Sequence, residues 1–145
     1  MEESTKVIMD AIVNYGPFDG VLAFSQGSCL YRIFHAYTQI VNPEPFKEIQ
    51  LPTFLLSFGG AVFPEYQIKI LGKFYDHFDF KHAIDSLHIY GSQDQYLANI
   101  EQEPSLFLPG HSGLPPTVVV HDEGHKVPRH YTPEHATIIK EFMKR

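Results

Sequence analysis

Short unbroken apolar runs alternate along the chain with stretches in which apolar residues recur every three to four positions. Unbroken runs are typical of strands buried on both faces, whereas the wider spacing is typical of helices that pack through one face. The runs predict strands at residues 20–24, 53–58, 86–91 and 117–121. The wider spacing and the intervening stretches predict helices at residues 3–14, 27–41, 64–82, 95–107 and 133–144.

Strands that alternate with helices predict a fold of the α/β class, in which helices cover both faces of a parallel sheet. Glycine and proline punctuate the pattern, and no internal repeat, low-complexity tract or linker interrupts it. A chain of 145 residues suits one compact domain that buries roughly two-thirds of its unfolded surface. We therefore expect a single α/β domain over residues 1–145.

Charge and composition argue against several classes of partner. The formal net charge is −6 and no basic run is present, so a nucleic-acid partner is not expected. No apolar run approaches the roughly 18 residues that a membrane span requires, and the acidic first residues are unlike a secretory signal. The one cysteine, Cys29, lies among apolar residues, which fits a core position and a reducing compartment. We expect a soluble, cytoplasmic protein.

The residues that follow the predicted strands contain a serine, an acid and a histidine, in that order. Ser25 follows the first strand, Asp94 the third and His125 the fourth. Functional groups in parallel sheets gather beyond the carboxyl ends of the strands. In α/β hydrolases the serine lies in a G-x-S-x-G turn between strand and helix, and the acid and the histidine come later. Here the turn reads AFSQG, with Ala23 in place of the first glycine and Gly27 retained.

Each of these three residues also has an ordinary structural interpretation. The hydroxyl of Ser25 could cap the following helix, and Asp94 could lie near a helix N-terminus, where the helix dipole favours an acid. His125 could be a solvated histidine of a loop. The order and the placement after successive strands favour a Ser-His-Asp triad over three unrelated roles.

The motifs GPFDGVLAFSQG, YGSQD and GHKVP resemble, in this order, those of the FSH-type serine hydrolases, a family of α/β hydrolases. The resemblance runs over nearly the whole chain. It implies that Ser25 is the nucleophile, Asp94 the triad acid and His125 the base, in a cytosolic esterase acting on acyl esters or thioesters. In this chemistry the backbone N–H of Gln26 donates to the oxyanion, and no cofactor is expected.

The resemblance covers only the later half of the family's sheet. Hydrolases of this family have earlier strands, and a loop after the first of these supplies one oxyanion donor. One lost donor typically costs about 100- to 1000-fold in rate, so slow turnover is expected. We therefore expect a truncated hydrolase-like sheet in which residues 20–24 form an apolar edge. Because open apolar edges pair with other chains, we also expect a homo-oligomer.

Other functions are less favoured by the sequence. A catalytically silent module that binds an acyl ligand or a protein partner is the alternative from a different class, and a splice or gene-model fragment is a third. A metal site is not expected, because Gly124 and Pro128 interrupt the histidine-rich stretch and H-E-x-x-H is absent. Nucleotide-binding glycine motifs are incomplete. We interpret Cys29 and the aromatic residues between 54 and 80 as core residues.

Overall fold

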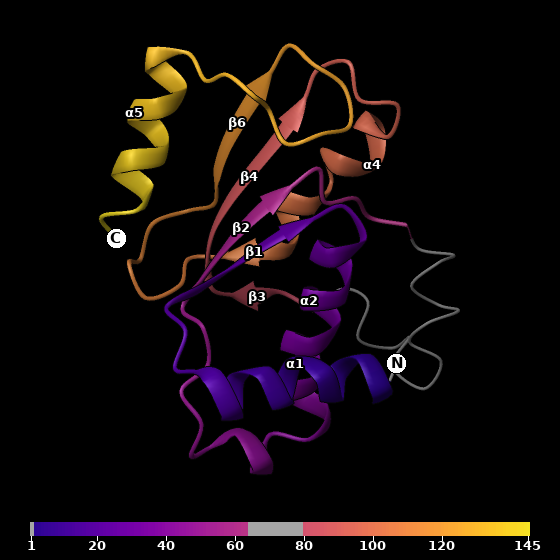
Figure 1. Ribbon diagram of the computed structural model, residues 1–145, viewed down its shortest axis with the longest axis vertical. Coiled ribbons are helices and arrows are strands. Elements are labelled where there is room, and N and C mark those ends of the chain that lie inside the picture. Colours follow the sequence, from indigo (N-terminus) through magenta and orange to yellow (C-terminus); the bar gives the residue numbers. More distant parts are fainter. Residues whose placement is uncertain (1, 64–79) are drawn as a thin grey trace.

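A computed structural model describes residues 2–63 and 80–145 and shows a parallel sheet with helices on both faces (Figure 1). The four strands lie in the order β1-β2-β4-β6, and each pairs in parallel with its neighbours. They are β1 (Gly20–Phe24), β2 (Phe54–Phe58), β4 (Asp85–Gly91) and β6 (Thr117–His121). Every bound lies within one residue of its prediction, and the α/β class is confirmed.

Three of the predicted helices are present. They are α1 (Glu2–Tyr15), α2 (Gln26–Ala36), which continues as a π-helical turn η1 (Tyr37–Val41), and α5 (Pro133–Phe142). A short 3-10 helix, η2 (Glu44–Phe46), follows η1. Most of the predicted helix at 64–82 lies outside the described residues. Its end is wrong, because His82–Ala83 form strand β3, which pairs in parallel with β5 (Phe107–Leu108).

The predicted helix at 95–107 is wrong for most of its length. The chain instead forms α4 (Leu97–Ile100), the 3-10 helix η4 (Glu103–Leu106) and then β5. Pro104 has no backbone N–H, so it cannot continue the helix by donating to the carbonyl of Ile100. The break turns Glu103 inward, where its side chain is buried.

The core has one cluster of apolar side chains on each face of the sheet. On one face α5 covers the strands through Ile138, Ile139 and Phe142. On the other face α1 and α2 cover them, with Ile12, Tyr31 and Phe34 among the packed residues. Because side chains alternate along a strand, Phe54, Leu56 and Phe58 of β2 face α5, while Leu55 and Ser57 face α2.

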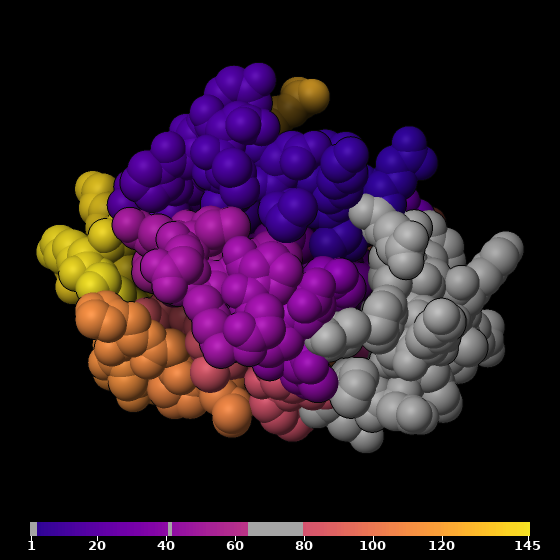
Figure 2. All heavy atoms as spheres, turned by 90° about the horizontal axis from the view of Figure 1, so that it is seen from below, coloured from indigo at the N-terminus to yellow at the C-terminus, as the bar shows by residue number. Residues whose placement is uncertain are grey.

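The two ends of the sheet differ in what surrounds them. The end from which the strands start is covered by α1 and by the chain that follows α2, which lie side by side in Figures 1 and 2. The strand arrows in Figure 1 point away from this end. They lead into the loops that carry the three residues of the predicted triad.

Candidate active site

The loops after β1, β4 and β6 bring Ser25, Asp94 and His125 into one chain of hydrogen bonds. His125 Nδ1 lies 2.7 Å from Asp94 Oδ2, and His125 Nε2 lies 2.8 Å from Ser25 Oγ. An ionised carboxylate can only accept, so Nδ1 carries the proton and Nε2 accepts from the serine hydroxyl. In this tautomer the imidazole is able to take the proton of the serine.

The backbone of Ser25 is held in a strained turn between β1 and α2. Its φ of 53° and ψ of −117° are unusual for a residue with a side chain, at a cost of about 1–3 kcal/mol. Its N–H donates to the carbonyl of Phe58 at 2.8 Å, which fixes the turn against the end of β2. Its hydroxyl makes no capping hydrogen bond to α2. The helix-cap interpretation is therefore wrong, and the turn has the geometry of a nucleophile elbow.

Ala23 occupies the place of the first glycine of the elbow without crowding it. Ala23 is buried in β1, on the face that α2 covers. A Cβ built on Gly27 would lie 3.8 Å from the Cβ of Ala23, which is an ordinary van der Waals distance. The alanine is therefore compatible with close packing of α2 on β1.

The carboxylate of Asp94 is buried and both of its oxygens have partners. Its side chain is 1% exposed, Oδ2 accepts from His125, and Oδ1 accepts from the N–H of Tyr96 at 2.8 Å. The N–H of Gln93 donates to the carbonyl of Glu123 at 3.1 Å, which joins the loop after β4 to the loop after β6. Asp94 is therefore held toward His125 by its own turn and by the neighbouring loop.

The imidazole of His125 is enclosed on several sides. The ring of Phe24 lies 5.1 Å away and the ring of Tyr96 5.2 Å away, measured between ring centroids. Gly59, at the end of β2, has a φ of +56°, and a Cβ there would lie 3.1 Å from His125 Cε1. The side chain of His125 is still 19% exposed. His125 is thus restricted in orientation but not sealed from solvent.

A cavity of about 310 Å³ opens beside the hydroxyl of Ser25. Its lining includes Ser25, Gln26, Cys29, Ala61, Phe63, Tyr96 and His125. Gln26 is the first residue of α2, where the N–H groups of the first helical turn form the positive end of the helix dipole. A negative charge that develops on a bound group next to Ser25 is favoured at such a position. The cavity has room for an acyl group with its carbonyl at Ser25.

Within residues 2–63 and 80–145, no three His, Cys, Asp or Glu side chains are arranged to hold a metal ion. In these same segments no helix combines the length and the apolar character needed to cross a bilayer. Cys29, the single cysteine of the sequence, is buried and also lines the cavity.

Sequence reasoning missed several residues around this site. It did not identify Phe24 or Tyr96 as neighbours of His125. It also missed a buried polar cluster on the α2 face of the sheet, to which β2 and β4 contribute Ser57 and His88. A signal was present, because both are polar residues inside runs that otherwise predict buried strands.

Comparison with known proteins is consistent with this geometry. A family model described as "Serine hydrolase (FSH1)" matches residues 1–136. The chain is 30% identical over 145 residues to esterase OVCA2 of zebrafish, covering 100% of this chain and 57% of that protein. It is 29% identical to esterase C25G4.2 of Caenorhabditis elegans, covering 99% and 58%, and 30% identical to human esterase OVCA2, covering 78% and 48%. The chain thus spans about half the length of these relatives, and it belongs to the FSH1 serine hydrolase family.

Proposed function

We propose that this chain is a serine hydrolase that cleaves acyl esters or thioesters, with Ser25 as the nucleophile. Ser25 Oγ attacks the acyl carbonyl carbon while His125 Nε2 takes the hydroxyl proton. The carbonyl oxygen becomes an oxyanion, to which the N–H of Gln26 donates. Asp94 holds the imidazole in orientation and stabilises its charged form.

The second half of the reaction restores the free enzyme. The bond from the carbonyl carbon to the leaving oxygen or sulfur breaks, and the leaving group takes the proton from His125. Ser25 keeps the acyl group. Water then attacks the carbonyl carbon of the acyl-serine ester while His125 takes a proton from the water. The bond from this carbon to Ser25 Oγ breaks, Ser25 takes the proton from His125, and the carboxylic acid departs.

One observation carries the proposal: a single imidazole is hydrogen-bonded to Asp94 and to Ser25 at the mouth of a cavity. The relatives are named esterases, which supports the same class of reaction. The chain covers 57% and 58% of two of these relatives, so an esterase activity like theirs is proposed for this chain and does not follow from the similarity alone.

The test is labelling by a fluorophosphonate probe, together with hydrolysis of a short chromogenic ester. Ser25→Ala and His125→Ala should both abolish labelling, because phosphonylation requires an activated serine. Cys29→Ser is the matched control, since this side chain lines the same cavity, and it should leave labelling largely intact. A folded parent chain that neither labels nor turns over esters contradicts the proposal and favours a silent module that binds an acyl ligand or a protein partner.

We further propose that two copies of the chain associate through the β1 edge. β1 pairs with β2 on one side, and within the described residues no strand pairs with its other side. Leu22 is 66% exposed on this strand, and a groove of about 400 Å³ between β1 and α1 is lined by apolar residues that include Ile8 and Phe18. Open backbone groups beside apolar side chains favour pairing with a second copy.

Light scattering at micromolar concentration tests this association. The parent should be a dimer or larger, and Leu22→Lys should shift it toward the monomer because a charge on an edge strand opposes pairing. A monomeric parent contradicts the proposal. We also propose a cytoplasmic location, supported by the single buried cysteine, and fractionation of the source cells checks it.

A further inference from the structure

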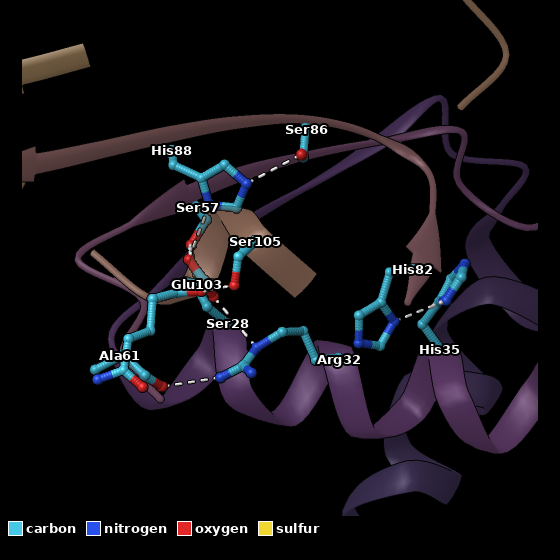
Figure 3. Close-up of polar contacts among 11 residues, drawn as sticks. Ser28, Arg32, His35, Ser57, Ala61, His82, Ser86, His88, Glu103 and Ser105 are labelled. Atoms are coloured by element: carbon cyan, nitrogen blue, oxygen red, sulfur yellow. Dashed lines mark hydrogen bonds and ion pairs between the residues drawn. The ribbon is translucent and has the colours of Figure 1, made fainter. Parts of the chain in front are cut away.

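A second carboxylate and histidine pair lies buried on the α2 face of the sheet (Figure 3). Glu103 of η4 is 1% exposed, and its Oε2 lies 2.9 Å from His88 Nδ1 and 2.6 Å from Ser57 Oγ. Its Oε1 lies 3.3 Å from Nε of Arg32, which is 4% exposed. The far nitrogen of His88 lies 3.0 Å from Ser86 Oγ. We call these five residues the buried cluster.

The charge of Glu103 is kept in the core by its neighbours. Burial raises the pKa of this carboxyl, but the hydrogen bond from His88 and the charges of His88 and Arg32 lower it further than burial raises it. Glu103 is therefore ionised at neutral pH. Placing an ion pair in a protein core costs several kcal/mol of desolvation per ion, so apolar residues would stabilise the fold equally well. A role beyond stability is a reasonable expectation for such a cluster.

The buried cluster touches the segment that forms one wall of the cavity. Arg32 Nη2 donates to the carbonyl of Ala61 at 2.8 Å, and Ala61 lines the cavity (Figure 3). A Cβ on Gly60 would lie 2.4 Å from both carboxylate oxygens of Glu103, so the carboxylate packs directly on this backbone. Gly59, one residue earlier, lies against the imidazole of His125.

The buried cluster also contacts the turn that carries the nucleophile. Ser57 Oγ lies 2.8 Å from Ser28 Oγ in the first turn of α2. A hydroxyl has one proton, so Ser57 donates to Glu103 and accepts from Ser28. The N–H of Ser28 donates to the carbonyl of Ser25 at 3.1 Å, and Phe58, which follows Ser57, accepts from the N–H of Ser25. The carboxylate of Glu103 is thus linked both to the turn that carries Ser25 and to the backbone that packs against His125.

We propose that Glu103 and Arg32 are positioning residues, which hold residues 59–61 and the first turn of α2 so that Ser25 and His125 stay aligned. This inference rests on the proposed function. Both side chains are enclosed, so they act through the backbone of the site and not on the substrate. Small misplacements of reacting groups have large effects, since about 1 Å can cost 100-fold in rate.

The test compares two carboxylate-to-amide changes, one in the buried cluster and one away from the proposed catalytic residues. Glu103→Gln weakens the buried cluster. Asp85→Asn is the matched control, because Asp85 is also buried but lies at the start of β4, where it accepts from the N–H and the hydroxyl of Ser112. Both variants should lower the melting temperature. Kinetics are measured at a temperature at which circular dichroism shows each variant folded.

Glu103→Gln should lower kcat for a short chromogenic ester about tenfold with KM within about twofold, because alignment of the reacting groups is affected more than binding. Asp85→Asn should keep kcat within about twofold. Ser57→Ala, a milder change, should lower kcat about threefold and serves if Glu103→Gln does not fold. Equal losses of kcat in Glu103→Gln and Asp85→Asn, or unchanged kcat in both Glu103→Gln and Ser57→Ala, overturn the inference.

A spectroscopic readout separates this inference from the proposed function. The low-field proton NMR signal of His125 Nδ1–H, assigned by its loss in His125→Ala, reports the hydrogen bond to Asp94 without any turnover. It should shift in Glu103→Gln and stay in place in Asp85→Asn. If the parent is inactive but the signal behaves in this way, the proposed function fails and the positioning contact stands. If the signal is the same in all folded variants, the positioning role is wrong.

Discussion

The same order of hydrogen bonds occurs twice in this molecule. Ser25, His125 and Asp94 are joined at 2.8 and 2.7 Å, while Ser86, His88 and Glu103 are joined at 3.0 and 2.9 Å. In both sets of hydrogen-bonded residues a carboxylate lies at Nδ1 of a histidine and a serine at Nε2. The two differ in what surrounds the serine.

The surroundings decide what each serine can do. Ser25 lies in a strained turn at a helix N-terminus and borders a cavity. Ser86 lies inside a regular strand and is 1% exposed, so no substrate carbonyl reaches its hydroxyl. A serine, histidine and carboxylate in a row are therefore not sufficient for a nucleophile. Access and a nearby donor for the developing oxyanion are also required.

The largest expected difference between the two sets of hydrogen-bonded residues is in catalysis. Ser25→Ala should lower kcat for a chromogenic ester by at least about 10,000-fold, because the proposed nucleophile is lost. Ser86→Ala should change kcat by less than about threefold, since it removes only one hydrogen bond to His88. Comparable losses in steady-state assays of the two variants would remove the distinction.

The next largest difference is in stability, where the loss of His88 should have a larger effect than the loss of His125. His88→Ala takes the hydrogen-bond partner from a buried carboxylate, so the free energy of unfolding should fall by about 3 kcal/mol or more. His125→Ala, at a partly exposed site, should change it by less than about 1 kcal/mol. Guanidinium denaturation measures both. An equal fall in the two variants would mean that the triad also carries the stability of the fold.

Two neighbouring glycines allow the comparison to be made within one dipeptide. Gly60→Ala places a methyl against Glu103 and should lower the free energy of unfolding by about 2 kcal/mol. Gly59→Ala places a methyl against His125 at a positive φ and should lower kcat about tenfold at a temperature where it is folded. Thermal melts and ester kinetics on both variants check this. Loss of kcat in Gly60→Ala with none in Gly59→Ala would mean that the packing of Gly59 against His125 does not affect catalysis.

The smallest expected effect concerns two more buried histidines on α2 and β3. His35 and His82 lie 3.1 Å apart between their Nδ1 atoms. Burial lowers the pKa of His35 to about 4, and burial with the charges of His35, Arg32 and Lys81 lowers the pKa of His82 to about 2. Below pH 6.5 these histidines take up protons in the unfolded chain but not in the folded chain, so the free energy of unfolding decreases as the pH is lowered.

At pH 5.5 each of these two histidines should reduce the free energy of unfolding by about 1 kcal/mol relative to neutral pH. Urea denaturation between pH 7.5 and pH 5 should show this decline. His82→Phe, which removes one of the two titrating groups, should show a shallower decline. The same slope in parent and variant would assign the pH dependence to other groups.

Much of the fold could be predicted because burial leaves a local trace in the sequence. The central strands β2 and β4 are enclosed on both faces, the outer strands β1 and β6 keep some exposed side chains, and the unbroken apolar runs predict all four to within a residue. Ser25, Asp94 and His125 were found because each follows one of these runs. Parallel strands that share a sheet bring such positions to one end.

What could not be predicted depends on contacts between distant residues. Leu97 and Ile100 have helical spacing, but Pro104 breaks the segment, and Ile100 and Leu106 are buried from two separate short helices. The two-residue strands β3 and β5 have no pattern of their own. Glu103 meets its partners on α2, β2 and β4 only after folding, so its spacing in the sequence carries no signal.

The parallel sheet has a practical consequence for handling the protein. The loop at residues 109–116 leads into the start of β6, at the end of the sheet opposite the cavity (Figure 1). Leu114 in this loop is 47% exposed, whereas Cys29, the single cysteine of the sequence, is buried. A thiol introduced by Leu114→Cys would therefore react first with a maleimide. A bead or electrode coupled there would present the immobilised molecules with their cavities facing outward.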